Sequence, residues 1–266
     1  MSRAILIPAR FQSTRYPGKP LVELKGVSGE AKPLIQRSVE AARKVAGVDA
    51  VHVVTDDERI AEACARFGAA VLMTSPECRN GTERCAEALS QLGADVDLVI
   101  NFQGDALLTP PGFVEALTAR MDSDRDALVA TPALRLRDPE VRALQAEEAA
   151  GRVGGTSVVV DAQGHALYFS KRLIPHLPAG ALGGGLSPIR LHVGVYAYRR
   201  EALERYVAAP VSELEQLEGL EQLRFLVEGV KMAVVEVASP AFALRELNNP
   251  EDVAPIEAAL AEAGLE

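Results

Sequence analysis

The segment from residue 8 to residue 20 concentrates chemical groups that can bind phosphate. It reads Pro-Ala-Arg-Phe-Gln-Ser-Thr-Arg-Tyr-Pro-Gly-Lys-Pro and contains the cations Arg10, Arg15 and Lys19. A short apolar run at residues 4–7 comes before it and predicts a buried strand. Cations, hydroxyl groups and backbone N–H groups at the carboxyl end of such a strand suit a polyphosphate. We therefore predict a polyphosphate-binding loop; the alternative is an ordinary basic surface loop.

Two further segments carry groups of the same kind. Asp105 follows an apolar run and the pair Gln103-Gly104, where a carboxylate is placed to hold Mg²⁺. The alternative for Asp105 is a residue in an ordinary turn. Gly81 and Thr82 open a predicted helix and offer N–H groups and a hydroxyl, with Arg84 one turn further on. The alternative there is a plain helix cap with a solvated arginine. The chain has neither a G-x-x-x-x-G-K-[ST] motif nor a G-x-G-x-x-G motif after a strand.

The elements that must position these groups alternate along the first part of the chain. Apolar runs predict strands at 4–7, 50–54, 70–73 and 98–102, and helical spacing predicts helices at 34–45, 58–67 and 81–92. This order is typical of an α/β fold with a doubly wound, mostly parallel sheet, in which ligands bind beyond the carboxyl ends of the strands. The polar residues Arg10, Asp56, Thr74 and Asp105 all follow predicted strands.

The second half predicts a different organisation. We expect strands at 127–131, 157–160, 166–169, 189–198 and 232–237, with a hairpin turn at 161–164. Helices are expected at 138–148, 200–207, 213–228 and 249–263, and the glycine-rich stretch 180–185 is expected to be a loop. We interpret residues 1–266 as a single domain in which residues 155–212 form a small inserted antiparallel lobe.

Composition narrows the functional classes. The 266-residue chain carries a net charge of −9, which argues against general nucleic-acid binding and makes the local cations more informative. Its cysteines, Cys64, Cys78 and Cys85, are odd in number and lack a C-x-x-C pair, which predicts free thiols in a reducing compartment. The sequence has no apolar run long enough to cross a membrane and no signal-peptide pattern, so we expect a cytoplasmic protein with no membrane partner.

The motifs, taken together, resemble those of one enzyme family. The segment I-P-A-R-x-x-S-T-R-x-P-G-K-P is similar to the opening of the 3-deoxy-manno-octulosonate (Kdo) cytidylyltransferases. The stretches N-x-Q-G-D, G-T-E-R, Met-Thr at 73–74, A-L-Y-F-S, H-x-G-x-Y-x-Y-R and L-E-Q-L-R resemble further motifs of that family, in the same order. The resemblance covers nearly the whole chain and implies a nucleotide-diphospho-sugar transferase-like fold.

The resemblance also implies roles for particular residues. It implies catalytic roles for Arg10, Lys19 and Asp105. It implies that the nucleotide is bound by Pro8, Ala9, Arg10, Ser13, Thr14, Arg15, Lys19, Thr74, Gly81, Thr82, Arg84 and Gln103. It implies that the sugar is bound by Gln103, His192, Tyr196, Glu221 and Gln222. Without the resemblance, the histidine would be interpreted as a satisfied strand residue, the tyrosine as core, and the Glu-Gln pair as the exposed face of a helix.

Five positions depart from the family pattern. Asn248 stands where the family has its second metal-binding Asp, so the implied Mg²⁺ ligands are Asp105 and Asn248. An amide offers a carbonyl oxygen but no charge, which should weaken Mg²⁺ binding. Ser157 replaces a Lys, Asn80 replaces a Ser, and Ala106-Leu107 replace the Glu-Pro that normally follows the aspartate.

The expected reaction follows from the resemblance. It is the transfer of CMP from CTP to the anomeric hydroxyl of Kdo or a close analogue, with Mg²⁺ as cofactor and pyrophosphate as the second product. The product would enter lipopolysaccharide biosynthesis, and the family commonly forms homodimers. Two alternatives stay open: a cytidylyltransferase for another acid sugar, such as an amino-Kdo or a sialic-type acid, and a non-catalytic homologue that binds CTP.

Overall fold

A computed structural model describes residues 2–13, 15–105, 107–242 and 244–265. Thr14, a predicted nucleotide-binding residue, lies outside the described residues. The chain forms two compact units. Unit 1 comprises Met1–Glu115, Ala197–Leu203 and Pro240–Glu266, and unit 2 comprises Ala116–Tyr196 and Glu204–Ser239. A single domain with an inserted lobe at 155–212 stays a prediction.

Unit 1 contains the predicted parallel sheet. Its strands are β1 (Ser2–Ala9), β4 (Ala50–Thr55), β5 (Ala70–Met73) and β6 (Val96–Phe102). They lie in the order β5-β4-β1-β6, and each neighbouring pair is parallel. The four apolar residues at the centre of β1 are fully buried, which is why a short run of alanine, leucine and isoleucine forms the middle of the sheet.

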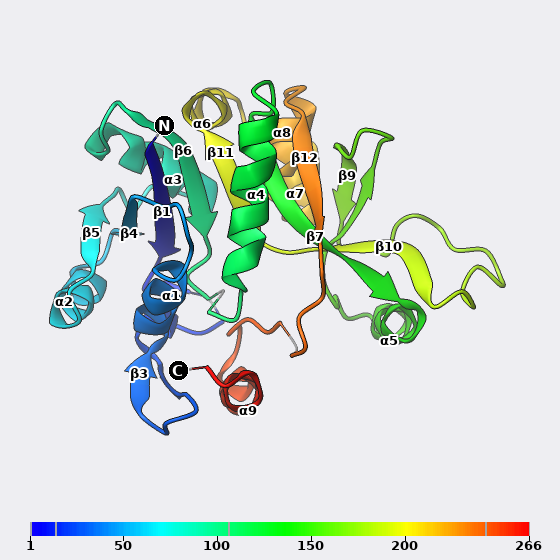
Figure 1. The fold of residues 1–266 in the computed structure, drawn as a ribbon, viewed down its shortest axis with the longest axis horizontal. Coiled ribbons are helices and arrows are strands. Elements are labelled where there is room, and N and C mark those ends of the chain that lie inside the picture. Colours follow the sequence, from blue (N-terminus) through cyan, green and yellow to red (C-terminus); the bar gives the residue numbers. More distant parts are fainter. Residues whose placement is uncertain (1, 14, 106, 243, 266) are drawn as a thin grey trace. The chain divides into compact units, whose positions relative to one another are not determined.

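Helices cover both faces of this sheet. They are α1 (Leu34–Ala42), α2 (Glu58–Arg66) and α3 (Gly81–Ala88), and Figure 1 shows α1 in front of β1 and α3 behind it. The side chain of Asp57 caps α2 by accepting from the N–H of Arg59. The doubly wound α/β arrangement is therefore confirmed. Both α1 and α3 end earlier than predicted, and α3 continues only as the 3-10 turn η2 (Leu89–Gln91).

Unit 1 also contains a small hairpin that was not predicted and a C-terminal helix that begins later than predicted. The hairpin of β2 (Glu23–Lys25) and β3 (Ala31–Pro33) follows the 3-10 turn η1 (Lys19–Leu21). The C-terminal segment forms η3 (Pro250–Asp252) and α9 (Val253–Ala263), where one continuous helix from 249 was expected. Leu24, Leu247 and Leu260 belong to one buried apolar cluster, so the C-terminal segment packs against the hairpin.

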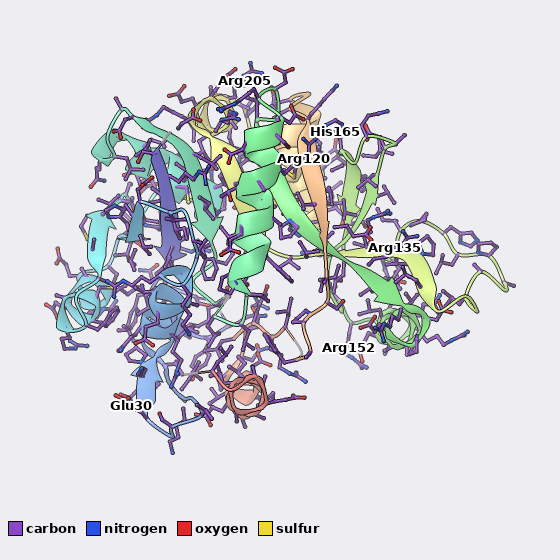
Figure 2. All side chains as sticks on the ribbon, viewed as in Figure 1. Glu30, Arg120, Arg135, Arg152, His165 and Arg205 are labelled. Atoms are coloured by element: carbon purple, nitrogen blue, oxygen red, sulfur yellow. The ribbon has the colours of Figure 1, made fainter. Side chains whose placement is uncertain are left out.

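Unit 2 is built around antiparallel strands. They are β7 (Val129–Arg137), β8 (Ser157–Val160), β9 (Ala166–Ser170) and β10 (Leu186–His192), in the order β7-β10-β8-β9, and β12 (Met232–Val237) pairs with β7 in parallel. The predicted hairpin of β8 and β9 and the helix α5 (Asp138–Ala149) are confirmed. Arg135 on β7, labelled in Figure 2, donates from Nε to the carbonyl of Ser187 on β10 at 2.9 Å.

Two predictions for the second half are wrong in detail. The run 189–198 is two strands, β10 and β11 (Val195–Arg199), because the N–H of Val195 turns back to the carbonyl of Val193 at 2.7 Å. The run 213–228 is two short helices, α7 (Glu213–Glu218) and α8 (Leu223–Val227), because Gly219 ends the first with a φ of +60°. The helix α6 (Arg200–Ala208) was predicted, and the helix α4 (Pro111–Ser123) was not. The boundaries between the two units fall within α4, α6 and β11.

Candidate active site

A pocket of about 330 Å³ lies at the carboxyl ends of the strands of unit 1. Three segments that are distant in the sequence meet there: the loop after β1, the start of α3 and the turn after β6. The lining residues are Pro8, Ala9, Arg10, Gln12, Ser13, Arg15, Lys19, Pro20, Leu34, Asn80, Gly81, Arg84, Gln103, Gly104 and Asp105. Most of the predicted nucleotide-binding residues are thus in one place, and Gln12 is a lining residue that was not predicted.

Each of the three loop cations is held by an acceptor from another segment. The Arg10 guanidinium donates to the carbonyl of Arg79 at 3.2 Å, and Arg15 donates to Oδ1 of Asn248 at 2.9 Å. The Lys19 ammonium lies 2.5 Å from a carboxylate oxygen of Asp105. These contacts fix the positive groups around the pocket before any ligand arrives, which lowers the cost of ordering them when an anion binds.

Close packing of the backbone shapes the floor of the pocket. A Cβ on Gly104 would lie 2.7 Å from the carbonyl oxygen of Pro8, so only glycine allows the turn after β6 to approach the loop after β1. Asn80 caps α3 by accepting from the N–H of Glu83 at 2.8 Å, and the N-terminus of that helix opens at the pocket. The start of a helix carries partial positive charge and adds to the preference for an anion.

Arg84 is positioned from beneath the pocket. It is almost fully buried; one Nη donates to the hydroxyl of Thr74 at 2.5 Å, and the other lies 3.0 Å from a carboxylate oxygen of Asp56. Asp56 was not predicted as a site residue, although its place directly after β4 was the available signal. Thr74 holds this arginine and is not among the residues that line the pocket.

The hydroxyl of Thr82 points elsewhere than predicted. It is fully buried and lies 3.0 Å from the hydroxyl of Tyr198, which is itself fully buried. The Thr82 side chain therefore fastens α3 inside unit 1 and does not line the pocket. Any contact of Thr82 with a nucleotide would have to use its backbone.

The predicted metal ligands have an unexpected neighbour. Much of Glu246 is exposed, but its carboxyl group accepts a hydrogen bond from Asn248 and senses the charge of Asp105. Partial removal of the carboxyl group from water, and then the negative charge of Asp105, raise the pKa of Glu246. Glu246 is thus a second acidic residue whose titration depends on Asp105, and the sequence motif alone gave no reason to look for it.

This group of oxygen atoms suits Mg²⁺. Mg²⁺ is usually bound by one or two carboxylates together with substrate phosphates; Asp105 lines the pocket and supplies one, and Glu246 is the candidate for a second. The ammonium of Lys19 already lies against Asp105, which shows that the position favours a cation. Within the described ranges, no group of three or more His, Cys, Asp or Glu side chains is placed to hold a metal ion.

The predicted sugar-binding residues belong to unit 2. The rings of His192 and Tyr196 lie 5.4 Å apart, and Phe169 meets the His192 ring edge-on at 5.1 Å. Burial lowers the pKa of His192 to about 3, so the ring is neutral at ordinary pH. Gln222 is buried, and its Nε2 has no hydrogen-bond partner in the described part of the chain. Glu221 immediately precedes it, and its backbone carbonyl accepts from the hydroxyl of Tyr206 at 3.3 Å.

Ser157, which replaces a Lys of the family pattern, has a structural explanation. It is buried, donates to the carbonyl of Arg172 at 2.5 Å and accepts from the N–H of Ile174 at 3.1 Å. The serine therefore holds the chain that follows β9. A lysine at this position could not make the hydrogen bond that Ser157 accepts from the N–H of Ile174.

The parallel strands of unit 1, the cation-lined pocket at their carboxyl ends and the acidic residue on its rim define a nucleotidyltransferase. A family model described as cytidylyltransferase matches residues 4–232. The chain is 41% identical to a 3-deoxy-manno-octulosonate cytidylyltransferase of Maricaulis maris (strain MCS10), over 99% of each chain. It is 38% identical to a mitochondrial enzyme of the same name from Arabidopsis thaliana, over 98% of this chain and 83% of that one. The chain belongs to the 3-deoxy-manno-octulosonate cytidylyltransferase family.

A solved structure agrees with this assignment. The structure of a CMP:2-keto-3-deoxy-manno-octonic acid synthetase, complexed with CTP, matches 99% of this chain and 100% of its own with a TM-score of 0.84 and 35% sequence identity. The predicted α/β fold and family resemblance are thus confirmed over the full length.

Proposed function

We propose that this protein transfers CMP from CTP to Kdo and releases pyrophosphate. The observation that carries the proposal is the convergence of Arg10, Arg15, Lys19 and Asp105 on one pocket at the carboxyl ends of parallel strands. That arrangement offers three positive charges to a triphosphate and one carboxylate to its metal ion. The names of the relatives supply the choice of cytidine nucleotide and of sugar.

In this mechanism the anomeric hydroxyl of Kdo attacks the α-phosphorus of CTP in line with the leaving pyrophosphate. A bond forms between that oxygen and phosphorus, the bond from phosphorus to the β-phosphate oxygen breaks, and the hydroxyl proton leaves to solvent. The chain's own work is positioning and charge neutralisation, because phosphoryl-type transfer needs little covalent help. Arg10, Arg15 and Lys19 hold the triphosphate and stabilise the negative charge that grows on pyrophosphate.

Asp105 and Glu246 would hold Mg²⁺, with Asn248 close by as a neutral donor. When bound, the ion neutralises phosphate charge and lowers the pKa of the attacking hydroxyl. Lys19 must leave Asp105 for this to happen, and the displaced ammonium then becomes available to a phosphate oxygen. Lys19 would thus pair with Asp105 when no metal ion is bound, and would contact a substrate phosphate when the metal ion is bound.

The sugar would be held by His192, Tyr196, Glu221 and Gln222, and by Gln103 at the nucleotide pocket. The buried Nε2 of Gln222 supports this role because a buried amide without a partner is costly and gains from a ligand acceptor. The side chain of Gln103 faces the start of α3, since a Cβ on Gly81 would lie 3.5 Å from its Nε2.

The cellular setting is part of the proposal. We place the enzyme in the cytoplasm, in lipopolysaccharide biosynthesis, because all three cysteines are free and buried, which suits a reducing compartment. In the part of the chain that the structure describes, no helix is both long and apolar enough to cross a membrane. We also propose a homodimer, with α7 at its interface.

The test is pyrophosphate release from CTP and Mg²⁺ with a panel of acid sugars. We expect turnover with Kdo to exceed turnover with an amino-Kdo and with a sialic acid. Turnover only with another sugar would replace the substrate in the proposal. Binding of CTP by calorimetry without turnover on any sugar would identify a non-catalytic homologue instead.

A further inference from the structure

We propose that Thr131 is a positioning residue that holds His192 in the tautomer protonated at Nε2 and so presents Nδ1 to a hydroxyl group of the sugar. The proposal rests on the proposed function for the identity of the ligand. The arrangement of the proton follows from unit 2 alone. In this proposal His192 accepts a hydrogen bond from a neutral sugar hydroxyl, and other residues bind the carboxylate of the sugar.

The geometry around Thr131 decides where the protons lie. Thr131 is fully buried on β7, and its Oγ1 lies 2.8 Å from Nε2 of His192 and 2.8 Å from the carbonyl oxygen of Val195. The carbonyl of Val193 is a more distant neighbour at 3.4 Å. A threonine hydroxyl has one proton to donate, and a carbonyl oxygen can only accept. The hydroxyl proton therefore belongs to the bond with Val195.

The histidine must supply the proton of the remaining contact. With its own proton committed, Thr131 Oγ1 accepts, so Nε2 of His192 donates and carries the ring proton. The opposite tautomer would turn the threonine proton toward Nε2 and take it away from the buried carbonyl of Val195. Losing a hydrogen bond to a buried carbonyl has a cost that the observed arrangement avoids.

The consequence falls on the other ring nitrogen. A neutral imidazole protonated at Nε2 has a lone pair at Nδ1, which can only accept. Nδ1 makes no hydrogen bond to any of the described residues, and part of His192 is exposed. Burial keeps the ring neutral by lowering the pKa of His192 to about 3. A neutral acceptor attracts a sugar hydroxyl and offers nothing to a carboxylate, which needs a donor or a positive charge.

The ring plane is fixed as well as the proton. The rings of Phe169 and His192 are edge-on with a centroid distance of 5.1 Å, and the ring of Tyr196 is tilted against the imidazole at 5.4 Å. With the two rings and Thr131 as three points of contact, the direction of the Nδ1 lone pair is set before the sugar binds. Such preorganisation improves binding by lowering the ordering cost.

A spectroscopic experiment tests the tautomer without any substrate. The chain has only four histidines, so a protein labelled with ¹⁵N in histidine gives a simple spectrum, and the variant H192Q assigns the signal of interest. We expect the wild-type signal to show a protonated Nε2 and an unprotonated Nδ1 at neutral pH. A signal showing a protonated Nδ1 would overturn the proposal, whether or not the enzyme uses Kdo.

Kinetics test the consequence for the sugar. T131V removes the hydroxyl and keeps the shape, T131S keeps the hydroxyl, and T118V removes another buried threonine hydroxyl of unit 2 as a matched control. In T131V we expect the KM for Kdo to rise about tenfold, with the KM for CTP within about twofold of wild type. T131S and T118V should retain the wild-type KM for Kdo. An equal effect of T131V and T118V, or no recovery in T131S, would contradict the positioning role.

Kdo analogues that each lack one hydroxyl group identify the partner of Nδ1. With the analogue that lacks this hydroxyl, wild type and T131V should have the same KM, because the coupling between Thr131 and that hydroxyl is then absent. If T131V raises the KM for Kdo and for every analogue by the same factor, no hydroxyl depends on the tautomer and the proposal fails. If wild type turns over no Kdo at all, the proposed function fails while the spectrum still reports the tautomer.

Discussion

At the scale of single residues, the acidic rim of the pocket depends on Asp105 and on the residues that can assist it. Asn248 stands where the family pattern has Asp, and Glu246, two residues earlier, has a pKa that the charge of Asp105 helps to raise. Glu246 is therefore the candidate for a second carboxylate beside a divalent cation, in place of the aspartate of the family pattern.

The first prediction concerns Asp105. D105N keeps the size of the side chain and removes its charge, so Lys19 loses its ion-pair partner and a metal ion loses a ligand. We expect turnover to fall by about 10³-fold, in the range found when one charged group at a reacting centre is lost. Pyrophosphate release measures turnover, and circular dichroism checks that the fold is intact. A folded D105N enzyme with near-wild-type turnover would contradict the metal assignment.

The second prediction separates Glu246 from Asn248. E246Q should raise the Mg²⁺ concentration at half-maximal activity about fivefold, since losing one unit charge at about 4 Å costs about 1 kcal/mol even in water. N248D adds a charge and should lower that concentration. The two changes together should restore a value near wild type. If E246Q has no effect while N248D does, the metal site uses position 248 and Glu246 is a bystander.

A third prediction uses the titration of His192, whose pKa burial lowers from 6.5 to about 3. Between pH 6.5 and 3 the unfolded chain binds a proton at this ring that the folded chain does not. Folding stability supplied by the neutral ring is therefore full above pH 6.5 and falls as the pH falls through this window. We expect urea unfolding of wild type to show a steeper loss from pH 6.5 to pH 4 than H192Q. Equal slopes would show that the ring titrates normally in the folded protein.

At the scale of elements, the turn between α7 and α8 depends on one glycine. Gly219 has a φ of +60°, and a Cβ there would lie 2.8 Å from Nζ of Lys171, a flexible group that can move. The backbone conformation is therefore the main cost of a side chain at this position. G219A is expected to destabilise the protein by about 1 kcal/mol.

The matched control is G112A. Gly112 lies in α4 with ordinary backbone angles, and no atom lies within 4 Å of an added Cβ. Alanine there should stabilise the protein by roughly 0.5–1 kcal/mol, because it favours helix and restricts the unfolded chain. Chemical denaturation measures both changes. Destabilisation of similar size in both variants would show that the backbone conformation at Gly219 is not the cause.

Sequence patterns predicted the elements whose period is strong and local. The apolar runs predicted every strand of the parallel sheet. Two features were missed: the local turn at Val193 that divides β10 from β11, and the helix α4, although Phe113, Leu117 and Met121 are buried on one face of it at helical spacing. The alternation of apolar residues does not reveal a turn that interrupts a strand-like run, because the apolar run continues on both sides of the turn.

The site divides in the same way. The loop cations, Gln103 and Asp105 were predicted because they follow buried strands, and strand ends meet at one edge of a parallel sheet. Asp56, Glu246 and Thr131 were not predicted as site residues. Asp56 and Thr131 each contact a site side chain that is distant in the sequence, and Glu246 lies outside the position at which the family pattern has its metal-binding residue. No local pattern distinguishes such residues from ordinary polar ones.

At the scale of the whole molecule, the surface of α7 bears on the oligomeric state. Leu217 is 75% exposed and Leu214 is 40% exposed, and the two are three residues apart, so they share a face of the helix. A large leucine side chain in water loses the free energy that burial would provide, about 2 kcal/mol if it were fully covered. The proposed contact with a second copy of this chain would cover this apolar pair.

The last prediction tests this homodimer. Light scattering should give a mass of twice 28.3 kDa for wild type at micromolar concentration. L217E places a charge on the proposed interface and should shift the mass toward the monomer, because an unpaired charge is not tolerated in a desolvated contact. The control is V27E, which charges an exposed valine of the β2–β3 hairpin in unit 1 and should stay dimeric. A dimer in both variants would place the interface away from α7, and a monomeric wild type would remove the dimer from the proposed function.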